Sequence, residues 1–122
     1  MKLAGVFSLV VGLLMVGQWT ASLVTGRVPE LATAPLEIGF HLAAEILTAL
    51  ALVLAGLAIL KKLRWGRTLF LVAGGMALYS IINSPGYFAQ RGQWAVVALF
   101  GGLFFAAVFA LMAAAFEDAG RD

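Results

Sequence analysis

The sequence predicts an all-α integral membrane protein, an up-down-up-down four-helix bundle. The first observation behind this prediction is composition, because 63% of the 122 residues are hydrophobic and only 11% are charged. About a quarter of the residues of a soluble domain are charged. The second observation is that long uncharged stretches recur along the chain, and about 20 apolar residues are enough to cross a bilayer. Together they exclude an ordinary water-soluble domain and predict a single transmembrane domain over residues 1–122.

Hydropathy and helix-boundary residues divide the chain into four predicted spans. The second span is predicted to start at Thr33-Ala34-Pro35. Proline has no backbone N–H group, and in the first turn of a helix that group would have no hydrogen-bond partner, so proline is favoured there. The third span stops at Asn83-Ser84-Pro85-Gly86, which predicts a type II turn. Short connections between the helices favour antiparallel neighbours. The predicted spans cover about residues 3–24, 35–60, 65–83 and 93–116.

Basic residues predict the orientation, since lysine and arginine in short loops are retained on the cytoplasmic side. Only Arg27 and Arg91 fall on one side of the predicted membrane. Six cations fall on the other side, so both termini are predicted to be cytoplasmic, and we expect the inner membrane of a bacterium. The small net charge of +2 and this placement argue against a nucleic-acid partner. The six inner cations are Lys2, Lys61, Lys62, Arg64, Arg67 and Arg121.

One stripe of the second span carries the first candidate site residues. Glu37, His41, Glu45 and Thr48 recur at helical spacing. An ionisable side chain in hydrocarbon is by default a functional hypothesis that needs a partner. We expect Glu45 and His41, four residues apart, to form a pair that exchanges a proton or balances a cation. Glu37 needs no further role, because the dipole of a helix favours an anion in its first turn.

Polar residues of the first and third spans are predicted to lie at the depth of Glu45. At about 1.5 Å per residue, Gln18, Glu45 and Asn83 all fall roughly 22 Å from the cytoplasmic boundary. Tyr79 and Ser80 share a helix face with Asn83, from which they are four and three residues apart. The alternative is that these side chains only join neighbouring helices. The predicted ligand-binding or proton-exchanging residues are Glu45, His41, Gln18, Asn83 and Tyr79.

Small residues predict where helix backbones approach each other closely. Gly5, Ser8 and Gly12 form a narrow face on the first span, which is the kind of surface that packs tightly in lipid. Gln18 lies roughly 140° around the same helix from Gly5, so one face would meet a neighbour within the chain and the other a second subunit. A second small-residue stripe, on the fourth span, consists of Ala95, Ala98, Gly102, Ala106 and Ala110.

Residues 41–56 read His-Leu-Ala-Ala-Glu-Ile-Leu-Thr-Ala-Leu-Ala-Leu-Val-Leu-Ala-Gly and are followed by a basic turn and another apolar span. This segment resembles the second helix of DoxX-like small four-helix membrane proteins, in which a glutamate precedes a Leu- and Gly-rich stretch. The resemblance implies a four-helix bundle that is sometimes linked to quinone or redox partners. The first span here lacks the arginine-rich start of that group, so no functional residue is transferred.

Several kinds of chemistry are excluded or unsupported. The absence of cysteine excludes disulfides and thiolate metal sites, and a single histidine excludes a bis-histidine haem held by one chain. There is no nucleophile elbow, P-loop, dinucleotide fingerprint or two-histidine zinc helix. We therefore assign no catalytic residue, metal site or cofactor. The alternative for the second span is that its histidine and one or two of its glutamates ligate a divalent metal, without a second histidine to help.

The sequence predicts a small membrane protein with a polar pocket in the outer half of the bilayer. The pocket would bind a small ligand or exchange protons or cations. The alternative is an accessory or structural subunit of a larger membrane complex. Lipid surrounds the chain in both readings, and a homo-oligomer is compatible with either.

Overall fold

The computed structural model describes residues 1–117, and within that range the chain is helical with no strand. The predicted all-α class is confirmed. Arg121, one of the predicted inner cations, lies outside the described residues. The helices are α1 (Lys2–Val24), α2 (Glu30–Thr33), α3 (Pro35–Leu60), α4 (Gly66–Asn83), α5 (Pro85–Gln90) and α6 (Trp94–Ala115).

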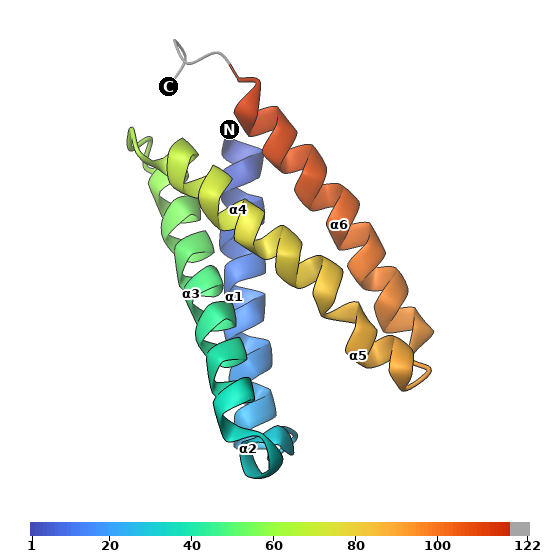
Figure 1. The fold of residues 1–122 in the computed structure, drawn as a ribbon. Helices are drawn as coiled ribbons and strands as arrows, with labels where there is room; N and C mark the ends of the chain where they lie inside the picture. The colour runs from blue at the N-terminus through green and yellow to red at the C-terminus, as the bar shows by residue number, and fades with distance from the viewer. Residues whose placement is uncertain (118–122) are drawn as a thin grey trace.

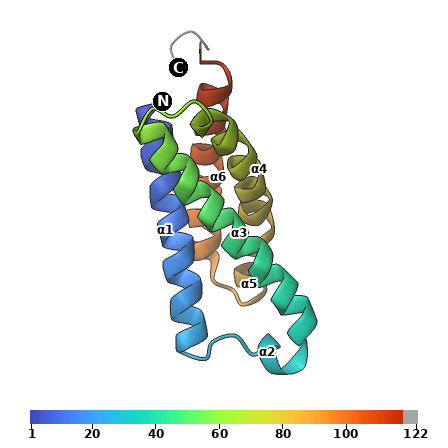
Figure 2. The same ribbon diagram turned by 90° about the vertical axis from the view of Figure 1, so that its left-hand side faces the viewer.

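Four helical segments of residues 1–117 are long and apolar enough to cross a membrane. They are α1, α3, α4 together with α5, and α6, and they span 22 to 26 residues each. The high hydropathy of the composition is therefore organised into four membrane-length helices, as a membrane protein requires. The short helix α2 lies in the connection between α1 and α3 (Figure 2).

The chain does not turn at Pro85, so the predicted type II turn is wrong. Ser84 has helical angles, φ −63° and ψ −35°, and α5 begins at Pro85 and continues the course of α4 (Figure 1). Proline is accepted there because the first N–H groups of a helix lack partners in any case. The reversal comes after α5, at Gly92, whose φ of +71° favours glycine.

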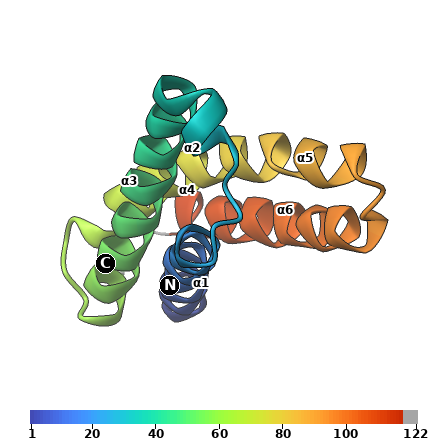
Figure 3. The same ribbon diagram turned by 90° about the horizontal axis from the view of Figure 1, so that it is seen from below.

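The long helices form two pairs that diverge toward one end of the molecule. The chain runs along α1 and back along α3, then along α4 and α5 and back along α6 (Figure 1). The two pairs meet where the N-terminus, the α3–α4 loop and the end of α6 lie, which we call the basic end. They separate toward α2 and α5, as the view along the bundle shows (Figure 3). At the basic end Ala4, Ile59, Phe70 and Ala114 bring α1, α3, α4 and α6 into one buried cluster.

Close packing of α1 on α3 confirms the predicted contact through Gly5, Ser8 and Gly12. A Cβ atom added to Gly12 would lie 2.8 Å from the backbone oxygen of Ala49. Ser8 is fully buried, and its hydroxyl donates a 2.6 Å hydrogen bond to the backbone oxygen of Leu52. This face of α1 is therefore the one that packs within the chain.

The helix α6 packs through a stripe that shares only Ala110 with the predicted one. Gly102 and Ala106 are exposed, and nothing lies within 4 Å of a Cβ atom built on Gly102. The predicted close contact at these two residues is wrong because Leu111 fits over Gly74 of α4 and sets the rotation of α6. The residues of α6 that are buried are Ala107, Ala110 and Ala114.

Candidate functional site

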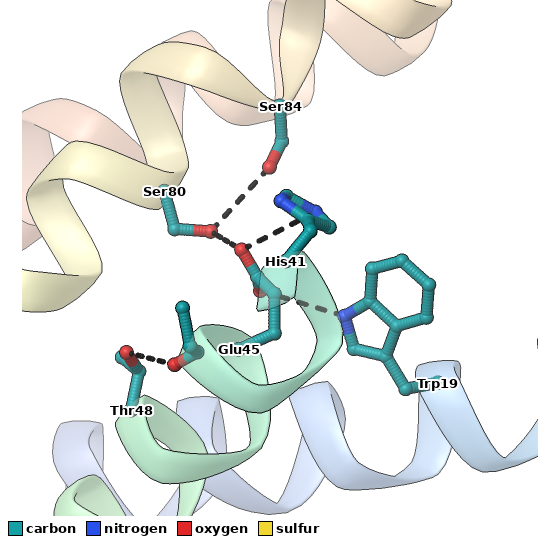
Figure 4. A network of polar contacts seen from close by, with 7 residues as sticks. Trp19, His41, Glu45, Thr48, Ser80 and Ser84 are labelled. Carbon is teal, nitrogen blue, oxygen red and sulfur yellow. Dashed lines mark hydrogen bonds and ion pairs between the residues drawn. The ribbon is translucent and has the colours of Figure 1, made fainter. Parts of the chain in front are cut away.

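Glu45 is the only ionisable residue that is buried within the described part of the chain, with 7% of its surface exposed. It lies in the middle of α3, on the predicted polar stripe, one turn after His41 and one turn before Thr48 (Figure 4). The Thr48 hydroxyl donates to the backbone oxygen of Ala44 and so is satisfied within its own helix. The carboxylate of Glu45 instead depends on contacts beyond its own turn of helix.

Donors from two other helices face the carboxylate of Glu45. The hydroxyl of Ser80 on α4 donates a 2.6 Å hydrogen bond to Oε1, and the indole Nε1 of Trp19 on α1 donates a 3.4 Å bond to Oε2 (Figure 4). A buried carboxylate is costly unless its oxygens are hydrogen-bonded. Glu45 therefore joins α1, α3 and α4, and both of its oxygens have a donor.

His41 stands at the exposed margin of this group. Its Nε2 lies 3.9 Å from Oε1 of Glu45, which is too long for a hydrogen bond, and 38% of its side chain is exposed. The imidazole ring stands edge-on to the ring of Trp19, with the centroids 5.7 Å apart. Neither Trp19 nor Ser80 carries a charge, so His41 is the one titratable group facing Glu45 among residues 1–117.

The Glu45 group also reaches the break between α4 and α5. The hydroxyl of Ser84 lies 3.4 Å from the hydroxyl of Ser80, one helical turn away (Figure 4). The next residue, Pro85, has no N–H group to donate to the backbone oxygen of Ile81. The carboxylate is thus linked through two hydroxyl groups to the point where the helical hydrogen bonding of this span is interrupted.

The other three predicted site residues lie away from Glu45. Gln18 is exposed on α1 and donates a 3.1 Å hydrogen bond to the hydroxyl of Ser22. Tyr79 is 73% exposed, and Asn83 is exposed near the end of α4. In the described chain no hydrogen bond joins any of these three to Glu45. Gln18 and Asn83 are at the predicted depth of Glu45, but depth along a helix does not fix which way the helix is rotated.

Trp19 and Ser80 were not among the predicted site residues, although each neighbours one that was. Trp19 follows Gln18, and Ser80 follows Tyr79, so both pairs lie at nearly the same depth. The sequence feature that identifies them is their hydrogen-bond donors, because a buried carboxylate needs donors and an indole N–H and a hydroxyl supply them. A search for donors at the depth of Glu45 would have included both.

An apolar groove of about 310 Å³ lies between α4, α5 and α6, apart from the Glu45 group. Gly101 leaves space in its wall, and Pro85 lies at the start of α5. Its lining contains no titratable side chain and none of the predicted site residues. Its other lining residues include Ile82, Val97, Phe100 and Phe105.

Over residues 1–117 the fold and the site define an all-helical protein with four membrane-length helices and one buried, hydrogen-bonded carboxylate. Its sequence matches the model of DUF8058, a domain of unknown function, over residues 1–121, and the chain therefore belongs to the DUF8058 family. No curated protein matches the chain, and no solved structure matches it.

Proposed function

We propose that this chain is an integral membrane protein whose termini and basic end face the cytoplasm, in a bacterial inner membrane. We further propose that Glu45 and His41 form a site in the outer half of the bilayer that exchanges protons or binds a small cation. The observation that carries this proposal is the buried carboxylate of Glu45, which faces donors from α1 and α4 and the half-exposed imidazole of His41.

The surroundings of Glu45 suit a change of charge. The hydrogen bonds from Ser80 and Trp19 stabilise an anion, but no lysine or arginine lies within 4.0 Å to neutralise it in the described chain. In an apolar medium the uncompensated anion is costly. The cost is removed when His41 takes up a proton, when Glu45 does, or when a monovalent cation binds beside the carboxylate. The first two are the steps of a proton-exchanging site, and the third is that of a cation-binding site.

A second candidate function is an accessory or structural subunit of a larger membrane complex, or of a homo-oligomer. One observation favours it, namely that every buried side-chain polar atom in the described residues already has a hydrogen-bond partner. Satisfied networks of this kind hold membrane helices together. The likeness of residues 41–56 to DoxX-like proteins remains a prediction from sequence, and a quinone or redox role forms no part of this proposal.

The site proposal is tested by exchange measurements in liposomes. The native protein should exchange protons or small monovalent cations with a dependence on pH, and Glu45→Gln should abolish it because a carboxamide does not titrate. His41→Gln should reproduce part of the loss. Glu37→Gln is the matched control, since Glu37 is an exposed carboxylate on the same helix. Folding is checked separately by thermal unfolding in detergent.

Two outcomes contradict the site proposal. One is native exchange that survives unchanged in Glu45→Gln. The other is a folded, reconstituted native protein that shows no exchange of protons or of small cations at all. Either result would mean that Glu45 has a structural role only, in which it joins α1, α3 and α4.

The orientation is tested with single cysteines, for which the chain has no native background. Thr33→Cys and Gln93→Cys should react with a membrane-impermeant thiol reagent in intact cells, and Leu63→Cys should not. All three positions are exposed in the structure, so a lack of reaction reports the membrane rather than burial. Labelling of the Leu63 variant alone contradicts the proposed orientation.

A further inference from the structure

We propose that the loop between α3 and α4, residues 61–65, binds the phosphate headgroup of an anionic phospholipid. Lys61, Lys62 and Arg64 are all exposed in this loop. None of the three has an ion-pair partner among residues 1–117, where the salt bridges are those of Met1 with Glu117 and of His41 with Glu45. The loop thus holds three uncompensated cations within four consecutive residues.

The loop is a preformed turn and not a loose connection. Its backbone folds back on the end of α3, with the N–H of Lys62 donating to Ile59 at 3.0 Å and the N–H of Leu63 donating to Ala58 at 2.8 Å. Gly66 fits tightly beside α3, where a Cβ atom would lie 2.9 Å from the backbone nitrogen of Ile59. The three cations are therefore presented by an ordered backbone, which lowers the entropy lost when they bind an anion.

Lys62 occupies a backbone conformation that lysine does not favour. Its φ of +58° is the only positive φ of a non-glycine residue in the described chain. The two other residues with positive φ, Gly26 and Gly92, also follow the ends of helices and are glycine. A residue kept in an unfavourable conformation points to a function for its side chain. The loop therefore keeps a cation, between Lys61 and Arg64 in sequence, at a position where the other two helix ends have glycine.

The apolar residues of the same loop select a lipid over a dissolved anion. Leu63 and Trp65 alternate with the cations and are 44% and 51% exposed. The loop joins the ends of two membrane-length helices, so it lies where headgroups meet hydrocarbon. Tryptophan prefers this interface, and each lysine or arginine near an anionic surface adds about fivefold to affinity, the equivalent of about 1 kcal/mol.

Nanodiscs of phosphatidylcholine, with and without phosphatidylglycerol, test the proposal. Native mass spectrometry counts the retained phosphatidylglycerol, and thermal unfolding reports stability. In the native protein phosphatidylglycerol should be retained and should raise the melting temperature. Because both faces of a nanodisc carry the same lipids, the result depends neither on the orientation nor on the site at Glu45.

The variant Lys62→Gly separates lipid binding from folding, because it should stabilise the fold while it weakens lipid binding. In phosphatidylcholine alone it should raise the melting temperature, since glycine adopts a positive φ without strain. In phosphatidylglycerol it should weaken lipid retention by about fivefold. The double variant Lys61→Gln with Arg64→Gln should weaken retention of phosphatidylglycerol more than Lys62→Gly does. Arg27→Gln, which removes an isolated exposed cation from another loop, is the control and should change retention by less than twofold.

Two results overturn the proposal. In the first, the Lys62, Lys61 and Arg64 variants retain phosphatidylglycerol as the native protein does. In the second, inorganic phosphate or glycerol phosphate stabilises the protein in neutral detergent as strongly as the lipid does in nanodiscs, which assigns the loop to a dissolved anion.

Discussion

The buried hydroxyl of Ser8 and the backbone oxygen of Leu52 are 2.6 Å apart and join α1 to α3. The glycines around this bond let the two backbones touch. Cβ atoms on Gly12 and Gly56 would lie 2.8 Å and 2.7 Å from backbone atoms of the facing helix. Backbones in lipid approach this closely only where side chains are small. The α1–α3 pair is therefore closely packed, and it places Trp19 opposite Glu45.

Gly12→Ala and Gly56→Ala should each lower the free energy of unfolding by about 1–3 kcal/mol, because the added methyl group meets backbone, which cannot rotate away. Unfolding in detergent measures the change. Gly17→Ala is the matched control on α1, since nothing lies within 4 Å of its Cβ position. Equal tolerance of alanine at all three sites contradicts the close contact of α1 and α3.

Two adjacent glycines of α4 offer a second comparison. A Cβ atom on Gly74 would overlap the side chain of Leu111 on α6, whereas the Cβ position of Gly75 is open. Gly74→Ala should therefore destabilise the protein by about 1 kcal/mol or more, and Gly75→Ala should not. Leu111→Ala should recover part of the loss when it is combined with Gly74→Ala, because it removes the overlapping atoms. Additive effects of the two changes contradict the proposed fit of Leu111 over Gly74.

Arg67 stabilises the end of α6, in addition to its place among the cations of the basic end. Its Nε donates to the backbone oxygen of Ala114 at 2.7 Å, and a terminal nitrogen donates to that of Ala115 at 2.8 Å. The last oxygens of a helix have no partners within it, so the forked guanidinium satisfies two of them. Arg67→Lys keeps the charge but loses the fork, and should cost about 1–2 kcal/mol of stability.

Unfolding in neutral detergent measures this cost, and Arg64→Lys is the control because Arg64 is exposed and makes no hydrogen bond in the described chain. Loss of stability in the Arg64 variant to the same extent as in the Arg67 variant contradicts a capping role. The sequence placed Arg67 with the other inner cations, since a charge count carries no information about which oxygens a guanidinium reaches.

What could be predicted from the sequence is what depends on distance along one helix. Glu45 and His41 are four residues apart on α3, and helix geometry alone brings them together. The small face of Gly5, Ser8 and Gly12 was recognised for the same reason. Composition and the length of apolar stretches likewise predicted the membrane-length helices, because these properties need no knowledge of neighbours.

What could not be predicted depends on how separate helices are rotated against each other. Trp19 and Ser80 face Glu45, while Gln18 and Tyr79, one residue away in sequence, do not. The packed stripe of α6 shares only Ala110 with the predicted stripe for the same reason, since the fit of Leu111 over a glycine of α4 depends on how α6 is rotated. The misplaced turn has another cause, because Pro85 is as compatible with the start of a helix as with a turn.

The bond between Ser80 and Glu45 offers a measure of the charge on the carboxylate. Ser80→Ala removes the donor and should destabilise the protein by about 1 kcal/mol. A hydrogen bond to an ionised acceptor is about twice as strong as one to a neutral acceptor. If Glu45 is ionised in the folded protein, the loss caused by Ser80→Ala should fall to about half in a Glu45→Gln background. Ser84→Ala is the control, because Ser84 contacts Ser80 and not the carboxylate.

All of these variants are compared by unfolding in the same detergent. The loss of stability caused by Ser80→Ala in the native background, minus the loss that it causes in the Glu45→Gln background, gives the coupling of Ser80 to the charge of Glu45. A clear coupling for Ser80 and none for Ser84 supports a charged carboxylate that is held by the α4 hydroxyl. Equal losses in the native and Glu45→Gln backgrounds contradict it, since a carboxamide oxygen would then accept the bond as well as the native group does. That outcome describes a neutral Glu45 that acts as a packing contact between α3 and α4.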